Sequence, residues 1–237
     1  MEKNICHRCY MSKDELNRLV YNDDLRQRIQ ANIDRFNYTA NSSRGMRKAA
    51  VALTIVELED DPGVYGMNTS GLPADHPALI LTRRNSRLNS HAGQWALPGG
   101  RMDEGETAEQ AALRELSEEV GLTLASEHVI GRLDDYTTRS GYIMTPVVIW
   151  GGVDITLNPN PAEVHSIHRI PVDELLRKDA PLLDEMPELE NPALMMPIGQ
   201  SWIASPTGAI LYQFREVAVK GLDTRVAHYE QPYFAWR

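Results

Sequence analysis

Hydrophobic residues follow two different spacings along the chain. Residues 48–58 and 78–84 are apolar runs rich in β-branched side chains, which are typical of buried strands. Residues 12–37 instead carry apolar side chains at roughly helical spacing and predict one long helix or two short ones. Further strand-like runs lie at 128–138, 142–153 and 209–219, and residues 163–178 predict a short strand followed by a helix. The chain is therefore expected to mix strands with helices.

One helix is delimited by its own sequence. Thr107 and Gln110 have the spacing of a capping box, in which each side chain accepts a hydrogen bond from the backbone of the other residue. Gly121 suits the left-handed conformation that ends many helices. Between these ends, apolar residues recur every four positions and predict a buried stripe, made of Ala112, Leu116 and Val120.

The same helix carries three crowded carboxylates, Glu115, Glu118 and Glu119. At about 100° per residue they share one sector of the helix, where like charges repel one another. A hard divalent cation would turn this repulsion into binding, because it takes oxygen ligands. Arg114 lies one turn before Glu118 and is expected to pair with it and with Glu106. Taken alone, such an acidic run is more often a solvated charged face than a metal site.

Composition narrows the classes of function. The chain has 237 residues and a formal net charge of −9, which argues against binding nucleic acid or an anionic membrane surface. Its two cysteines, Cys6 and Cys9, lack the second ligand pair of a zinc ribbon and are expected to be exposed thiols without a catalytic role. No stretch has the length of a transmembrane helix, and the N-terminus lacks the apolar run of a signal peptide, so a cytoplasmic location is expected.

The acidic helix and the loop before it match a known motif. Gly100, Glu106 and the run 114–122 agree at every position with the Nudix box, G-x5-E-x7-R-E-U-x-E-E-x-G-U, where U is a bulky aliphatic residue. The chain thus resembles a Nudix hydrolase. This resemblance implies an α/β fold, an α/β/α sandwich around a mixed β-sheet, with added N-terminal helices and a C-terminal extension. It also implies cleavage of a nucleoside diphosphate linked to another group, with Mg²⁺ or Mn²⁺ as cofactor.

The roles of the box residues follow from the same resemblance. It implies a metal site formed by Gly100 through its carbonyl, Glu115, Glu118 and Glu119. Metals there would neutralise pyrophosphate oxygens and lower the pKa of a water that attacks phosphorus. Arg114 is expected to complete the catalytic set with Glu115 and Glu119. Members of the family differ in which glutamate takes the proton of that water, and both Glu115 and Glu163 remain candidates for this chain.

A second resemblance concerns the substrate. Residues 80–100 are similar to the signature of coenzyme A pyrophosphatases within the Nudix family, LLT-x-R-[SA]-x3-R-x3-G-x3-FPGG. The matching residues expected to bind substrate are Thr82, Arg84, Gly93 and Gly99. Three positions depart from the signature, namely Asn85, Asn89 and Leu97. Further along the chain, residues 138–148 and 158–175 resemble the same subgroup, and the second stretch places Glu163 at a glutamate of that pattern.

The resemblance leaves three interpretations of function. The first is hydrolysis of coenzyme A or an acyl derivative to 3',5'-ADP and a phosphopantetheine. The second is hydrolysis of another nucleoside diphosphate derivative, such as ADP-ribose, a dinucleotide, a diadenosine polyphosphate or a nucleotide sugar. The third is a ligand-binding Nudix domain without catalysis, which the complete carboxylate cluster disfavours. In each case the partner is a small molecule, with no nucleic acid and no membrane.

The resemblance covers only the middle of the chain. Residues 1–47 are predicted to form an N-terminal helical segment and linker. Residues 48–180 are predicted to form the hydrolase core, and residues 181–237 a C-terminal extension packed on that core.

Overall fold

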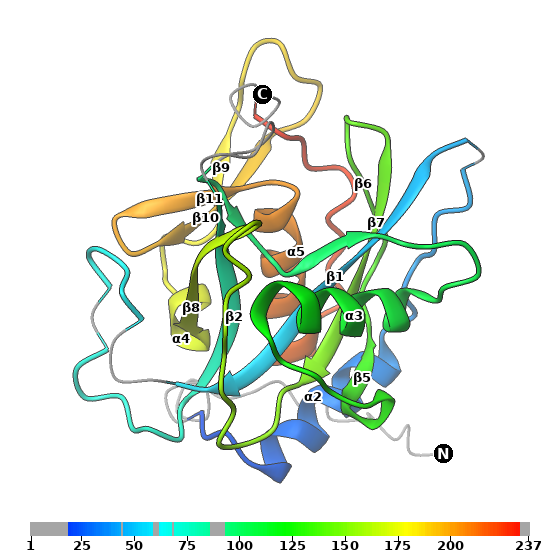
Figure 1. Cartoon of the computed structure of the whole chain (residues 1–237). Helices are drawn as coiled ribbons and strands as arrows, with labels where there is room; N and C mark the ends of the chain where they lie inside the picture. Colours follow the sequence, from blue (N-terminus) through cyan, green and yellow to red (C-terminus); the bar gives the residue numbers. More distant parts are fainter. Residues whose placement is uncertain (1–18, 44, 59–61, 68, 86–92, 233–237) are drawn as a thin grey trace, which may run out of the picture.

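The computed structural model describes residues 19–43, 45–58, 62–67, 69–85 and 93–232, so Cys6, Cys9 and Asn89 lie outside the described residues (Figure 1). The elements are α2 (Asp23–Arg35), β1 (Arg47–Glu57), β2 (Pro77–Arg84), β3 (Trp95–Ala96), β4 (Gly99–Arg101), α3 (Ala108–Val120), the 3₁₀ turn η1 (Ser126–His128), β5 (Val129–Arg132), β6 (Tyr136–Thr137), β7 (Tyr142–Trp150), β8 (Val164–Pro171), α4 (Val172–Leu175), β9 (Leu182–Asp184), β10 (Ala193–Ile198), β11 (Ser201–Ala204), α5 (Thr207–Phe214) and the π-helix η2 (Arg215–Val219). Within this part of the chain, no helix is long and apolar enough to cross a membrane.

A mixed sheet forms the centre of the molecule. Its longest strand, β1, runs parallel to β7, from the pair Arg47 and Tyr142 to the pair Ile55 and Trp150. β1 also pairs antiparallel with β2 and with the short strand β4. Strands β8 and β3 pair with β2, while β5 and β6 pair with β7. The expected mixed sheet is therefore confirmed.

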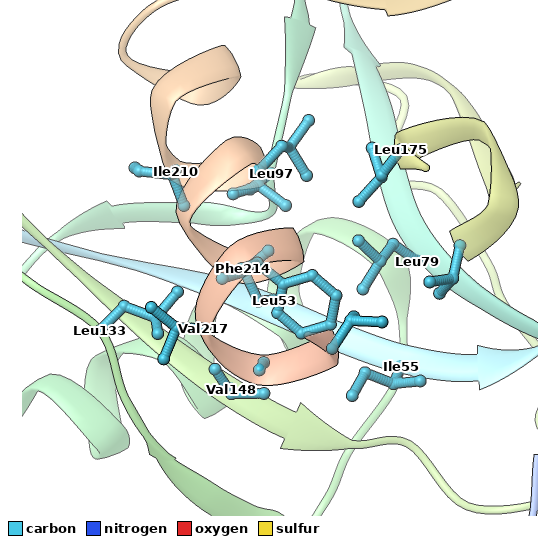
Figure 2. Packing of buried hydrophobic residues seen from close by; sticks show 14 of the residues in the cluster. Leu53, Ile55, Leu79, Leu97, Leu133, Val148, Leu175, Ile210, Phe214 and Val217 are labelled. Carbon is cyan, nitrogen blue, oxygen red and sulfur yellow. The ribbon is translucent and has the colours of Figure 1, made fainter. Parts of the chain in front are cut away.

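Helices cover both faces of this sheet. Successive residues of β1 point to opposite faces, as strand geometry requires. Val51, Leu53 and Ile55 enter one apolar core, whereas Ala50, Ala52 and Val56 enter the other. The first core is closed by α5 and η2, where Phe214 and Val217 pack beside Leu53 (Figure 2). The second core is closed by α3, so the expected α/β/α arrangement is confirmed (Figure 1).

Helix α3 has the ends that its sequence predicts. The Thr107 side chain accepts a hydrogen bond from the Gln110 backbone, and the Gln110 side chain accepts one from the Thr107 backbone. Gly121 follows the helix with a left-handed φ of 73°. The predicted stripe is fully buried, with Ala112, Leu116 and Val120 each 0% exposed. Both ends of the acidic helix are thus held in place by its own sequence.

The N-terminal helix is confirmed in part. Helix α2 begins after Asn22, whose side chain accepts a hydrogen bond from the Leu25 backbone at 2.9 Å. Its apolar face, Leu25, Ile29 and Ile33, is buried in the same core as Phe214. Residues 12–18 of the predicted helical stretch lie outside the described residues.

The strand prediction for residues 209–219 is wrong. These residues form most of α5 and all of η2. Ile210, Phe214 and Val217 follow helical spacing and enter the core together, but the neighbouring Leu211 and Ala218 are buried as well. A segment that is apolar on nearly every side has no contrast between faces, so its period cannot be read from the sequence. The small antiparallel sheet of β9, β10 and β11 before this helix was not predicted.

Candidate functional site

The carboxylates of α3 lie directly beneath strand β4. A Cβ added to Gly100 would lie 2.3 Å from the Oε1 atom of Glu115, so any side chain at this position would displace the carboxylate. A Cβ on Gly99 would lie 2.4 Å from the carbonyl oxygen of Ala50, on the neighbouring strand β1. The two glycines therefore allow β4 to pass tightly between the central strand and the acidic helix.

Arg114 holds the acidic residues in a fixed arrangement. Its Nε and Nη2 atoms donate to the two oxygens of Glu106 at 2.9 and 3.1 Å. Its Nη1 atom donates to Glu115 at 2.8 Å and to Glu118 at 3.1 Å. The expected pairings with Glu106 and Glu118 are present, and Nη2 also donates to the carbonyl of Arg101 at 3.1 Å. The guanidinium in turn holds the pKa of Glu106 below its usual range through these hydrogen bonds.

Two carboxylates of the cluster resist ionisation. Burial raises the pKa of Glu119 to about 8, and the negative charges of Glu115 and Glu163 add to that effect, while the charge of Arg84 opposes it. Burial also raises the pKa of Glu115. Glu119 is only 4% exposed. Without a cation, the site gathers more negative charge than its surroundings can stabilise.

The donor chemistry of this cluster fits a hard divalent metal. Its side chains offer only carboxylate oxygens, which are the ligands that Mg²⁺ and Mn²⁺ prefer. Among the described residues, no three histidine, cysteine, aspartate or glutamate side chains already stand together as a metal cage. Arg114 instead donates from its Nη1 atom to one oxygen each of Glu115 and Glu118.

A loop brings Glu163 to the same place. This loop is joined to the end of α3, since the backbone N–H of Asn160 donates to the carbonyl of Glu119 at 2.9 Å and that of Asn158 donates to Val120 at 2.8 Å. These bonds satisfy carbonyl groups that the last turn of a helix leaves without partners. Glu163 is exposed and lines the same cleft as Glu119. The structure therefore brings together two glutamates that are 44 positions apart in the chain.

Asn85 attaches the other side of this loop. Its backbone N–H donates to the carbonyl of Glu163 at 2.8 Å, and its side-chain Nδ2 donates to the carbonyl of Pro161 at 2.7 Å. Sequence reasoning missed this role, because Asn85 stood out only as a departure from the coenzyme A signature. A serine or alanine at this position could not reach Pro161 in the same way.

Glu115, Glu118, Glu119 and Glu163 open into one cleft of about 1,040 Å³. Its charged residues are Arg83, Arg84, Arg101, Glu115, Glu118, Glu119, Arg139 and Glu163. Arg84 enters from the end of β2, and its Nε atom is buried without a hydrogen-bond acceptor among the described residues. Arg83 lies 3.9 Å above the ring of Trp95 and donates to the carbonyl of Gly93 at 3.0 Å.

The residues expected to contact substrate fall into two groups. Arg84, Gly93 and Gly99 line the cleft. Thr82 does not belong to the described lining, since it is 1% exposed and its hydroxyl donates to the carbonyl of Ala96 at 3.3 Å. Its contacts are those of a residue that joins strands β2 and β3.

One wall of the cleft was missed entirely by sequence reasoning. It consists of residues 201–207, from strand β11 and the start of α5, with Trp202 as its aromatic residue. No motif marks this stretch, because its residues are uncharged and lie far along the chain from the box. The sequence shows only that residue 202 is a tryptophan, not that it is exposed.

Comparisons with known proteins agree with this site. A model of the NUDIX domain matches residues 68–189, just over half of the 237-residue chain. The chain is 41% identical over 102 residues to NudL of Yersinia enterocolitica, an uncharacterized Nudix hydrolase, covering 43% of this chain and 52% of that protein. It is 43% identical over 101 residues to NudL of Photorhabdus laumondii, covering 42% and 54%. The chain thus spans about half the length of the curated relatives it matches.

A solved structure gives a weaker likeness. The MutT/nudix family protein from Enterococcus faecalis shares 15% identity with a TM-score of 0.47, covering 76% of this chain and 64% of that one. The family assignment rests instead on the domain match, which includes Gly100, Glu106, Arg114 and the glutamates of α3. By this match over more than half of its length, the chain belongs to the Nudix family.

Proposed function

We propose that this protein is a pyrophosphohydrolase that cleaves coenzyme A or an acyl-coenzyme A to 3',5'-ADP and the corresponding 4'-phosphopantetheine. The observation that carries the reaction type is the convergence of Glu115, Glu119 and Glu163 beside Arg84 in a single cleft. The preference for coenzyme A rests on the signature resemblance of residues 80–100.

The proposal assigns the cofactor, Mg²⁺ or Mn²⁺, to the oxygens gathered around β4 and α3. Its ligands would be Glu115, Glu118, Glu119 and the carbonyl of Gly100. When bound, the metal would neutralise pyrophosphate oxygens and supply a water of lowered pKa. Arg84 would face the same phosphates, which provide the acceptor that its buried Nε atom lacks among the described residues.

We assign the proton of the attacking water to Glu163 in preference to Glu115. Glu115 already accepts a hydrogen bond from Arg114 and lies against Gly100, with only 12% of its side chain exposed. Glu163 is exposed at the cleft, and its loop is held by Asn85 and Asn160. A general base must be both accessible to the water and fixed in position.

Two departures from the coenzyme A signature are compatible with this substrate. Leu97 is 4% exposed, belongs to the apolar core and is not itself part of the described lining, so its replacement of a phenylalanine changes packing beneath the cleft and not a group that faces the substrate. Asn85 holds the loop of Glu163. Asn89, the third departure, lies outside the described residues.

Turnover on a panel of substrates tests the proposal. The purified protein is incubated with coenzyme A, acetyl-coenzyme A, ADP-ribose, NADH and diadenosine tetraphosphate, with Mg²⁺ or Mn²⁺, and products are identified by mass spectrometry. We expect 3',5'-ADP from the coenzyme A substrates, lost with EDTA and in Glu119→Gln. Glu127→Gln, a change at an exposed residue outside the cleft lining, is the matched control and should retain activity. Turnover of another substrate while coenzyme A survives would refute the substrate assignment and leave the reaction type standing.

A further inference from the structure

Strand β11 of the small sheet β9–β11 lines the cleft and also contributes to the core. In the pairing of β10 with β11, Ile203 lies opposite Met196 and Trp202 opposite Pro197. Ile203 is 2% exposed and belongs to the main apolar core. Because neighbouring residues of a strand point to opposite faces, Trp202 must point away from that core. It is 43% exposed and lines the cleft.

This wall is firmly attached to the rest of the molecule. Both the backbone N–H and the hydroxyl of Ser205 donate to the carbonyl of Leu194 at 3.0 Å. A Cβ on Gly208 would lie 2.3 Å from the carbonyl oxygen of Ile203, so the start of α5 presses directly on β11. A side chain that stands on packed elements is a better binding platform than one on a loop. Trp202 therefore has a defined position relative to the cleft.

The two sides of the cleft differ in chemistry. Residues of α3, β4 and the end of β2 carry most of the charged side chains of the described lining, and Glu163 and Arg139 add to them from two turns, whereas residues 201–207 carry no ionisable side chain. A substrate with a charged pyrophosphate and a neutral aromatic base would be oriented by this difference. The other tryptophan of the lining, Trp95, is 7% exposed and is covered on one face by Arg83. Trp202, at 43%, is the more exposed of the two.

We propose that Trp202 is the platform on which the nucleobase of the substrate stacks, and that β11 thereby forms a base-binding subsite. This inference rests on one part of the proposed function, namely that the substrate contains a nucleotide. It does not require that the substrate be coenzyme A. Stacking on an aromatic ring accepts any base, because every base has a π-face. Trp202 thus makes the protein bind a nucleotide more tightly than a pyrophosphate that lacks a base.

Calorimetric binding of two probes tests the subsite separately from turnover. ADP and inorganic pyrophosphate are titrated with Mg²⁺ into the wild-type protein, Trp202→Ala, Trp202→Phe and Tyr38→Ala. Tyr38 is the matched control, since it is 45% exposed and lies outside the described lining of the cleft. We expect Trp202→Ala to weaken ADP binding about tenfold or more while leaving pyrophosphate unchanged. Trp202→Phe should bind ADP within about threefold of wild type, because a smaller aromatic ring still stacks.

Several results would overturn the subsite. Equal loss of ADP and pyrophosphate binding in Trp202→Ala would show a purely structural role, as would loss in Trp202→Phe equal to that in Trp202→Ala. Unchanged ADP binding in Trp202→Ala would exclude stacking on this residue. If instead only the coenzyme A assignment is wrong, ADP will still bind in a manner that depends on Trp202, but coenzyme A will not be cleaved.

Discussion

Replacing Glu119 by glutamine should stabilise the protein in the absence of metal, although it should abolish turnover. Glu119 is 4% exposed, and burial raises its pKa to about 8, against roughly 4.3 for an unperturbed glutamate. One pKa unit corresponds to about 1.4 kcal/mol, so ionised Glu119 destabilises the metal-free fold by on the order of 3–5 kcal/mol above pH 8. Glutamine has nearly the same shape and never acquires that charge.

The sign of the pH dependence follows from proton binding. Between the unfolded and folded pKa values of Glu119, the folded protein binds more protons than the unfolded chain, so its stability falls as the pH rises. The stabilising effect of Glu119→Gln should therefore be small near pH 4.5 and complete above pH 8. For a chain of this length, a few kcal/mol correspond to a rise in Tm of roughly 5–15 °C.

Thermal unfolding in EDTA, followed by circular dichroism from pH 5 to pH 8.5, measures this effect. Glu118→Gln is the matched control on the same helix, because the Glu118 side chain is 58% exposed and should follow wild type. With saturating Mg²⁺ at pH 8, wild type should have the higher Tm, because an ion that binds only the folded state stabilises that state. Glu119→Gln gains less from Mg²⁺, since it lacks one of the oxygens proposed to bind the ion. If the Tm values of wild type and Glu119→Gln in EDTA fell in parallel as the pH rises, the argument would be refuted.

Three further substitutions test the geometry around the cluster. Gly100→Ala would place a Cβ 2.3 Å from Oε1 of Glu115 and displace this carboxylate. We expect kcat/KM to fall about a hundredfold with little change in Tm, and unchanged steady-state kinetics would contradict this expectation. Asn85→Ala removes the 2.7 Å hydrogen bond to the loop of Glu163 and should lower kcat about tenfold at nearly constant KM, whereas a loss confined to Tm would argue against a positioning role. Phe214→Ala should reduce the free energy of unfolding, measured by urea titration, by about 3–5 kcal/mol, because Phe214 is 0% exposed in the main core. A loss below about 1 kcal/mol would contradict this packing.

Local signals in the sequence predicted α3 and the central strands well. Thr107 and Gly121 define both ends of α3 through side-chain and backbone geometry that does not depend on the rest of the fold. Strand β1 is buried on both faces, and its continuous apolar run made it easy to recognise. The pairings of Arg114 were predictable for the same reason, since residues one helical turn apart must meet.

The same reasoning fails where tertiary packing decides. Residues 209–219 are enclosed by the sheet on one side and by other elements on the rest, so their apolar run fits a strand and a helix equally well. Nothing local reveals that Asn85 reaches Pro161, because that contact joins segments 76 positions apart. Thr82, which was expected at the substrate because it lies inside a family motif, has a hydroxyl that joins strands β2 and β3.

One side of the cleft could be predicted from the sequence and the other could not, because the two sides differ in chemistry. Charged clusters such as Glu115 and Glu119 are unfavourable unless they bind something, so their spacing in the sequence already points to a ligand. An uncharged wall such as that around Trp202 has no such conflict, and its residues are indistinguishable in the sequence from ordinary surface or core. Motifs therefore point to the part of a substrate that would react, which is a pyrophosphate in the proposed function. The part that would distinguish one pyrophosphate from another would meet residues that only the folded chain brings to the cleft.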